Sequence, residues 1–298
     1  MDKLTLEYRR YGPWMMEVKA LIDIPPQFEH YQQAILAAKY CFKVPVDQAR
    51  RDLEPGMLMY QSVVILEANR IRVLSFNKAA ELQEQALDYA DINYIVHSGD
   101  LLSCHLQLFS RHHSIHIDYS LVSVNIAAKA LHIIREAMHQ HSQPLALTQH
   151  EPVEGAKLQV YQYFLQREAI TEPVSILAFQ ASRSLDEELT KGFQHLLARL
   201  FRYKMQDVLF MSDGHDLMIS NWGTDIIREK RTDYHVEHLF IPWRLIKGMS
   251  LGEHPRFSYL KTLQVQTQFR DFTFSVEADF SLDPLLDFQQ KMQNLTLA

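Results

Sequence analysis

The segments VVILEANRIRVLSFN (residues 63–77) and VLFMSDGHDLMISNW (residues 208–222) follow one plan. Each consists of a short apolar run, a turn at Ala68-Asn69 or Asp213-Gly214, and a second run with a period of two residues. Two such runs around a short polar turn predict a β-hairpin. Because the same hairpin is predicted in both halves of a chain of 298 residues, we expect an internal duplication.

The two copies continue toward the C-terminus. LDYADINYI (87–95) aligns with IPWRLIKGM (241–249) without a gap, so that Tyr89 corresponds to Trp243 and Ile92 to Ile246. LLSCHLQLF then corresponds to YLKTLQVQT, and SIHIDYS to DFTFSVEADFS. Each half should end in an amphipathic helix with a buried stripe. The stripe residues are Val124, Ala127, Leu131, Ile134 and Met138 in the first half and Leu285, Phe288, Met292 and Leu295 in the second.

The copies also extend toward the N-terminus. KLTLEY (3–8) resembles KLQVYQY (157–163), and VKALIDIP (18–25) corresponds to VSILAFQAS (174–182), so we expect two strands in each half. A helix should follow in each half, because apolar residues then recur every three or four positions. These positions are Phe28, Tyr31, Ile35, Ala38 and Phe42, and Leu185, Leu189, Phe193, Leu196, Leu200 and Tyr203.

The sequence therefore predicts an α+β protein built from two tandem modules. A run of antiparallel strands closed by one C-terminal helix, over residues 57–142 and 203–298, resembles the bacterial relatives of the pleckstrin-homology (PH) and GRAM domains. This resemblance implies that each module is a bent antiparallel sheet, or partly open barrel, capped by its final helix.

Module boundaries follow from the duplication. The first module spans 1–142, with a strand-strand-helix extension (1–56) before the PH-like part (57–142). A linker (143–156) leads to the second module (157–298), with its extension (157–202) and PH-like part (203–298). Whether the extensions join the barrels or form separate layers stays open.

Composition restricts the classes of function. An apolar content of 47% can form cores for two modules, and the net charge of −6 is spread over both halves, which disfavours binding to nucleic acid. The N-terminus lacks an apolar export signal and no 18 apolar residues run together, so we expect a cytoplasmic protein. The two cysteines, Cys41 and Cys104, lie in apolar segments and are predicted to be buried.

RHHSIHIDYS (111–120) is rich in potential metal ligands. If Leu102–Phe109 pairs with Ser114–Tyr119, then Leu106 and Leu108 face Ile117 and Ile115 on the core side. His105 then lies across from Asp118, and His116 lies across from Gln107. His105, His116 and Asp118 would share the outer face, and His112 could turn toward them, which makes them candidates for a zinc site.

The second copy argues against a metal. Its corresponding residues are polar strand formers without metal chemistry, Thr262, Gln264, Thr273 and Ser275. This comparison favours a polar sheet surface in both copies, and we expect no metal and no cofactor.

Other short patterns point away from catalysis. GMSLG (248–252) matches a nucleophile elbow around Ser250, but Pro255 and a period of two follow it, so a strand ending at a turn is favoured. HVEH (235–238) lacks the spacing of a helical metal site and is interpreted as a solvated loop. The nine glycines form no phosphate-binding loop.

The most basic short run is IIREKR (226–231), at about the position where a phosphoinositide-binding PH domain would carry a basic loop. Arg228, Lys230 and Arg231 are therefore candidate lipid-binding residues. Asp225 and Glu229 dilute the positive charge, so a solvated hairpin tip is favoured.

The prediction is a non-enzymatic, cytoplasmic protein-binding or scaffolding protein without catalytic residues, whose partner is another protein or a second copy of the chain. Two alternatives stay open. One is a metal-dependent enzyme with a site at the junction of the modules that uses His105, His116 and Asp118. The other is a peripheral membrane protein that binds anionic lipid through Arg228, Lys230 and Arg231.

Overall fold

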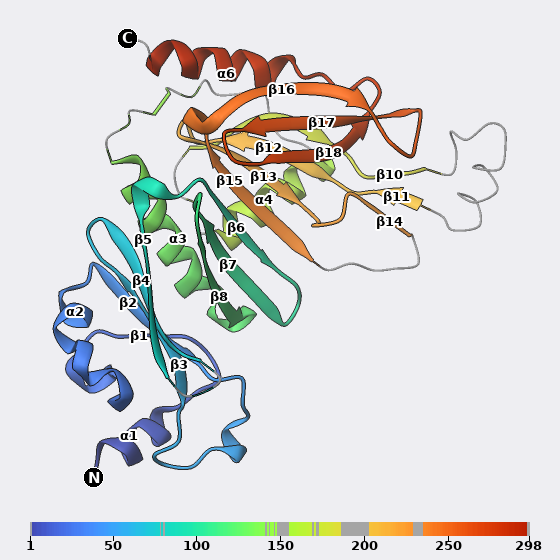
Figure 1. The fold of residues 1–298 in the computed structure, drawn as a ribbon. Helices are drawn as coiled ribbons and strands as arrows, with labels where there is room; N and C mark the ends of the chain where they lie inside the picture. The colour runs from blue at the N-terminus through green and yellow to red at the C-terminus, as the bar shows by residue number, and fades with distance from the viewer. Residues whose placement is uncertain are drawn as a thin grey trace. The chain divides into compact units, whose positions relative to one another are not determined.

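The fold is described from a computed structural model (Figure 1). The chain forms two compact units. Unit 1 contains Met1–Ile92, Leu102–His141 and Arg167–Ala169, and unit 2 contains Asn93–Leu101, Ser142–Gln166 and Ile170–Ala298. The structure describes residues 2–77, 79, 81–140, 142, 144–145, 147, 155–168, 170, 173–185, 203–228 and 235–296.

KLTLEY, expected to be a strand, belongs to an α-helix, α1 (Lys3–Arg10). The Asp2 carboxylate begins this helix by accepting hydrogen bonds from the backbone N–H of Thr5 at 2.8 Å and from the Thr5 hydroxyl at 2.9 Å. Arg9 and Arg10 lie in the last turn, where positive charge favours the helix dipole. These end signals outweigh a six-residue alternation that fits either structure.

The second expected strand of unit 1 was also wrong. Strand β1 covers only Met16–Glu17, and a 3₁₀ turn, η1 (Leu21–Asp23), follows. The Asp23 carboxylate accepts hydrogen bonds from the backbone N–H groups of Lys19 at 3.2 Å and Ala20 at 3.1 Å. An acidic side chain that bonds to nearby backbone in this way stabilises a turn in place of an extended strand.

The helix predicted through Phe42 ends five residues earlier. It consists of a 3₁₀ segment, η2 (Pro26–Tyr31), and a short helix, α2 (Gln32–Ala37). The chain is then extended at Ala38 and continues as strand β2 (Tyr40–Pro45), where Phe42 is fully buried. The predicted spacing extended too far because Phe42 on the buried strand β2 happens to follow the buried residues of η2 and α2 at a helical interval.

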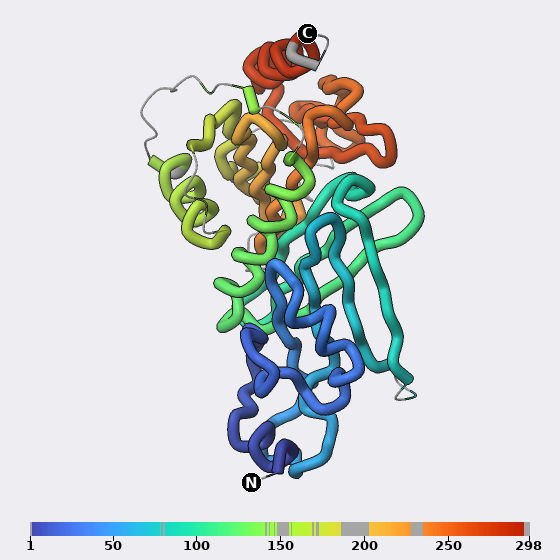
Figure 2. Tube along the Cα trace, turned by 90° about the vertical axis from the view of Figure 1, so that its left-hand side faces the viewer, coloured from blue at the N-terminus to red at the C-terminus, as the bar shows by residue number. Residues whose placement is uncertain are grey.

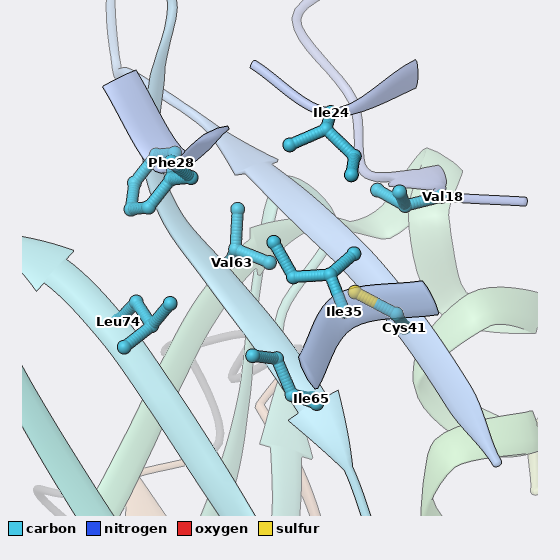
Figure 3. Close-up of a cluster of buried hydrophobic side chains, with 8 residues drawn as sticks. All are labelled: Val18, Ile24, Phe28, Ile35, Cys41, Val63, Ile65 and Leu74. Carbon is cyan, nitrogen blue, oxygen red and sulfur yellow. The ribbon is translucent and has the colours of Figure 1, made fainter. Parts of the chain in front are cut away.

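Phe28 and Ile35 are buried, as the predicted stripe required. They gather with side chains from the neighbouring strands in one apolar cluster, so that η2 and α2 cover a face of the sheet (Figure 3). The cluster contains Val18, Ile24, Phe28, Ile35, Cys41, Val63, Ile65 and Leu74.

The first sheet of unit 1 is antiparallel, in the order β1-β2-β3-β4-β5. The 3₁₀ turn η3 (Arg50–Asp52) precedes β3 (Tyr60–Leu66), and β4 (Arg70–Phe76) and β5 (Leu82–Asp88) follow, with the 3₁₀ turn η4 (Tyr89–Asp91) after them. The pairing of β3 with β4 confirms the hairpin predicted over 63–77. Strand β2 belongs to this sheet, so part of the N-terminal extension joins it.

The second hairpin of unit 1 pairs β7 (Ser103–Phe109) with β8 (Ser114–Ser120). Its register is the predicted one, with Leu106 opposite Ile117 on the buried side and His105 opposite Asp118 on the other. After the 3₁₀ turn η5 (Leu121–Ser123), the expected helix forms as α3 (Val124–His139) and contacts η4, β3 and β7. Leu131 is buried in it.

Helix α4 (Gly155–Arg167), which lies in unit 2 up to Gln166, forms where KLQVYQY was expected to be a strand. The largest sheet of unit 2 contains β6-β15-β13-β12-β9, and the smaller sheets are β10-β11-β14 and β16-β17-β18. Residues 186–202, where we predicted the second amphipathic helix, lie outside the described residues. The bounds are β6 (Tyr94–Gly99), β9 (Ser175–Gln180), β10 (Arg183–Ser184), β11 (Tyr203–Met205), β12 (Val208–Ser212), β13 (Asp216–Asn221), β14 (Ile226–Arg228), β15 (Val236–Pro242), η6 (Trp243–Leu245), β16 (Ile246–Glu253), β17 (Leu260–Thr267), β18 (Asp271–Glu277) and α6 (Asp283–Thr296).

Several predictions for unit 2 are confirmed. Residues 208–222 form the hairpin β12–β13, and residues 174–182 contain the strand β9, which pairs with β12. The hairpin β17–β18 and the final helix α6 also form, with Leu285 and Phe288 buried. The α+β class with antiparallel sheets is thereby established.

Strand β6 comes from the first half of the sequence but lies in unit 2. It pairs antiparallel with β15, with His97 opposite His238. Both histidines are fully buried. The ring of Phe164 on α4 lies 4.9 Å from the ring of His238, centroid to centroid.

Candidate functional site

The residues proposed for a metal site do not all come together. The Nδ1 atom of His105 lies 2.7 Å from Oδ1 of Asp118, whereas Nε2 of His116 lies 2.7 Å from the Ser114 hydroxyl. His112 is exposed, and its backbone N–H donates a hydrogen bond to the Ser110 hydroxyl at 3.3 Å. Among the described residues, no group of three or more His, Cys, Asp or Glu side chains could hold a metal ion.

The corresponding face of the second copy differs from the expected open polar surface. Ser275 is buried, and both its backbone N–H and its hydroxyl donate to Oδ2 of Asp225, at 2.9 and 3.2 Å. Burial raises the pKa of Asp225, and the two hydrogen bonds from Ser275 oppose that rise. The polar face is thus covered in part on β18, because Asp225 accepts the hydrogen bonds of Ser275 there.

The lipid-binding candidates are described only in part. Arg228 is the last residue of β14, where it pairs with Tyr203 of β11. Lys230 and Arg231 lie outside the described residues. The structure therefore does not test whether the three side chains form one basic surface.

Two short patterns have clear outcomes. Ser250 lies within β16 opposite Gln264, so no turn into a helix surrounds it, as we predicted. The interpretation of HVEH as a solvated loop was wrong, because residues 236–238 belong to β15 and His238 is fully buried. Val236, His238 and Phe240 alternate along the strand, and an aromatic imidazole next to Phe164 fits such a covered face.

The structure also reveals an ionisable group that sequence reasoning missed. Glu7 is the one buried residue of α1, with 8% of its surface exposed. Both of its carboxylate oxygens are buried and accept no hydrogen bond from the described residues. A buried carboxylate without a hydrogen-bond donor is costly in its charged form, so Glu7 marks a candidate site.

Lys43, on β2, supplies the opposite charge. Its side chain is buried, its Nζ donates to the carbonyl oxygen of Asp23 at 2.8 Å, and the same Nζ lies 4.2 Å from the centroid of the Tyr60 ring. The Tyr60 hydroxyl in turn donates to the sulfur of Met16 at 3.3 Å. The ammonium is thereby held over an aromatic face in an apolar surrounding.

Burial moves the pKa values of Glu7 and Lys43 toward neutral pH. Burial raises the pKa of Glu7 to about 7, although the positive charges of Lys43 and Lys3 oppose the rise. Burial lowers the pKa of Lys43 to about 8, against the negative charges of Glu7 and Asp23. A carboxyl group and an amine that titrate within one pH range are typical of functional sites.

Glu7 and Lys43 can therefore each bind and release a proton near neutral pH. We name Glu7, Lys43 and Tyr60 the buried ionic cluster. One signal in the sequence could have pointed to it. Lys43 interrupts the run YCFKVPV, in which the neighbours are apolar. A lone lysine in such a run predicts a buried amine that needs a partner, but nothing local identifies that partner as Glu7.

Neither the comparison with protein-family models nor the search of curated proteins finds a match for the chain. Among the helices that the structure describes, none combines the length and apolar character that crossing a membrane would need.

Proposed function

We propose that the chain is a tandem of two PH-like modules that acts in the cytoplasm by binding another protein, without catalysis. The observation that carries the proposal is a repeated order of strands. In the first half β2-β3-β4-β5 are neighbours in one antiparallel sheet, and in the second half β9-β12-β13-β15 are neighbours in the same way. Three further strands and one helix then follow in each half, β6, β7, β8 and α3, or β16, β17, β18 and α6.

A detailed match at the end of each four-stranded set supports the duplication. Tyr89 and Trp243 are both buried and each begins a 3₁₀ turn. The backbone N–H of Tyr89 donates to the carbonyl oxygen of Asn69 at 2.9 Å, and that of Trp243 donates to His215 at 3.1 Å. Each acceptor lies in the turn of the preceding hairpin, so the two halves repeat a tertiary contact as well as an order of elements.

A binding surface is supported by apolar exposure in unit 1. The side chains of Leu102 and Val122 are 78% and 76% exposed, respectively. The backbone N–H of Leu121 donates to the carbonyl oxygen of Leu102 at 3.2 Å, which brings the start of β7 next to the η5 turn that carries Val122. These two are the most exposed large apolar side chains among the described residues, and exposed apolar surface is what a protein contact would cover.

The test is chemical crosslinking of the tagged full-length chain in its native cell. The variant Leu102→Ser/Val122→Ser is compared with Leu21→Ser/Ile22→Ser, which replaces two other apolar residues that are 52% and 53% exposed. We expect a defined protein, or a second copy of the chain, to be crosslinked to the wild type and to the control. Recovery with the first variant should fall about tenfold, since losing apolar anchors typically costs more than about 1 kcal/mol.

Equal recovery of that protein with both variants would contradict the proposed surface. A wild-type chain that crosslinks to no protein above the level of an unrelated tagged control would contradict the proposed function itself. Light scattering of the purified chain distinguishes a second copy from a different partner.

A further inference from the structure

We propose that α1 is a proton-controlled cover: protonated Glu7 holds the helix on the β2–β3 surface, and loss of that proton weakens the docking of α1 and uncovers Lys43 and Tyr60. This inference does not depend on the proposed binding function. It concerns how the N-terminal segment of unit 1 responds to pH.

The first step is the way in which α1 is attached. Besides Glu7, α1 is held by Tyr8, which packs against an apolar cluster, and by two ion pairs at the exposed rim, Lys3 with Glu29 and Arg10 with Asp23 at 3.3 Å. Exposed ion pairs of this kind stabilise by little. Arg50 of η3 also donates to the carbonyl oxygens of Tyr8 and Arg9, at 3.5 and 3.3 Å, and α1 lies beside the η3 loop (Figures 1 and 2). Glu7 is the one buried residue of α1.

The second step is what α1 covers. The apolar cluster beneath it consists of Tyr11, Leu53, Met59 and Tyr60, with Tyr8 of α1 packed against it. The rings of Tyr11 and Tyr60 meet edge to face, with centroids 5.7 Å apart. Departure of α1 would therefore expose an aromatic surface next to the Lys43 ammonium, which is suited to bind an acidic partner.

The third step is the electrostatic surrounding of Glu7. The positive charges of Lys43 on β2 and Lys3 on α1 lower the pKa of Glu7. The negative charge of Glu7 in turn adds to the effect of burial in raising the pKa of Tyr60 on β3. The charge of Asp23 raises the pKa of Lys43, and the charge of Arg10 lowers it. The charge of Asp47 adds to the effect of burial in raising the pKa of Tyr11. The positive charges favour ionised Glu7, yet burial without a hydrogen-bond donor outweighs them, so docked α1 retains the proton up to about pH 7.

The sign of the pH effect follows by linkage. The pKa of Glu7 is higher in the docked state, about 7, than its ordinary 4.5, so docking is strongest at acid pH and weakens as pH rises through both values. Between about pH 5.5 and about pH 7.5 the docking constant should fall about 20-fold. Lys43, with a pKa of about 8 when docked, contributes little to the change in that range.

The experiment uses the full chain with a spin label on the Arg9→Cys thiol, on the exposed side of α1. Both native cysteines are buried, so the label goes to the new thiol. We expect the mobile fraction in the electron paramagnetic resonance spectrum to rise from pH 5.5 to pH 7.5 in the wild-type background. In Glu7→Gln, α1 should stay docked, and the mobile fraction should not change with pH. Glu29→Gln, which removes an exposed carboxylate beside α1, is the control and should keep the wild-type response.

Two further outcomes decide the proposal. In Lys43→Met the midpoint should move to higher pH, because the charge that favours ionised Glu7 is gone; a purely structural role of Lys43 would not move it. A wild-type spectrum that is flat with pH, or a Glu7→Gln spectrum that keeps the transition, would overturn the proposal. Near-ultraviolet circular dichroism at each pH confirms that the rest of the chain stays folded, so that a mobile label reports α1 alone.

Discussion

Two glutamates of unit 1 have opposite environments. Glu7 is buried without a hydrogen-bond donor, whereas Glu17 accepts from Tyr40 at 2.9 Å and pairs with Lys19 at 2.7 Å and Lys129 at 2.9 Å. The bond from Lys19, together with those from Lys129 and Tyr40, lowers the pKa of Glu17 to about 2. Donors decide the ionisation of each carboxyl group, and two of those at Glu17, Tyr40 and Lys129, come from segments far from it in the sequence.

The first prediction concerns Glu17, which joins β1 to α3 through Lys129. Its pKa is depressed in the fold, so its contribution is present above the ordinary value of 4.5 and is lost as pH falls toward 2. Glu17→Gln should lower the free energy of unfolding by about 1–2 kcal/mol near neutral pH, after allowance for the exposed lysines. Urea unfolding at several pH values should show the difference between wild type and variant shrinking below about pH 4. A difference that grows on acidification would contradict it.

The second prediction compares two neighbours on β8. Ile117 is buried opposite Leu106, and Asp118 is exposed opposite His105. Ile117→Asp should unfold unit 1, since a buried charge costs several kcal/mol, whereas Asp118→Ala and His116→Ala should each cost less than about 1 kcal/mol. Thermal melts with and without EDTA provide the measurement. A melt that depends on the chelator and loses that dependence in His116→Ala would favour a metal site instead.

At the scale of elements, the sequence predicted hairpins better than helices. The turns Ala68-Asn69 and Asp213-Gly214 stand between clear apolar runs, so periodicity and turn chemistry agree. KLTLEY alternates over only six residues, which cannot separate a strand from a helix, and the deciding cap is the preceding Asp2. The helix predicted through Phe42 failed because β2 is buried on both faces, so that its apolar residues do not alternate with exposed polar ones.

The third prediction concerns the turn of β12–β13. Gly214 has φ +90°, and a Cβ there would lie 2.6 Å from the backbone oxygen of Leu145. Gly214→Ala should therefore destabilise by about 2–3 kcal/mol, through backbone strain and displacement of the segment around Leu145. Gly252→Ala, where a Cβ meets nothing within 4 Å, is the control and should stay within about 0.5 kcal/mol of wild type in urea unfolding. Equal losses for the two would count against this reading of the turn.

The fourth prediction concerns the final helices. Leu131 of α3 and Phe288 of α6 are buried, and the Phe288 ring lies 5.1 Å from that of Trp243, between centroids. Each change to Ala should cost about 2–4 kcal/mol by calorimetry or urea unfolding. Leu286→Ala, on α6 but 39% exposed, should cost less than about 1 kcal/mol. Losses below about 0.5 kcal/mol at Leu131 and Phe288 would mean that these helices cover no core.

At the scale of the whole molecule, the chain does not divide cleanly at the middle of its sequence. Strand β6 comes from the first half but pairs with β15 in unit 2. No local pattern in residues 94–99 could have predicted this partner, because a strand specifies its own faces and not its distant neighbour. The buried ionic cluster was missed for a similar reason, since α1, β2 and β3 must first fold together to bury Glu7.

The fifth prediction follows from β6. A fragment of residues 143–298 lacks this strand, so the edge of β15 would be uncovered and His238 would lose its cross-strand neighbour His97. We expect the fragment to self-associate in size-exclusion chromatography with light scattering, because unpaired strand edges recruit other strands. Adding a peptide of residues 93–101 should reduce the association, and the same peptide with His97→Asp should not. A monomeric fragment without peptide would contradict the prediction.

The two paired strands β6 and β15 are synthesised at different times. His97 and His238 are 141 residues apart, so at about 5–20 residues per second the first strand is synthesised roughly 7–28 s before its partner. During that interval the backbone groups of β6 that later bond to β15 have no strand partner and are open to pairing with other strands. Codon usage or chaperone binding between the two strands would therefore change the yield of folded chains without altering any residue of the finished protein.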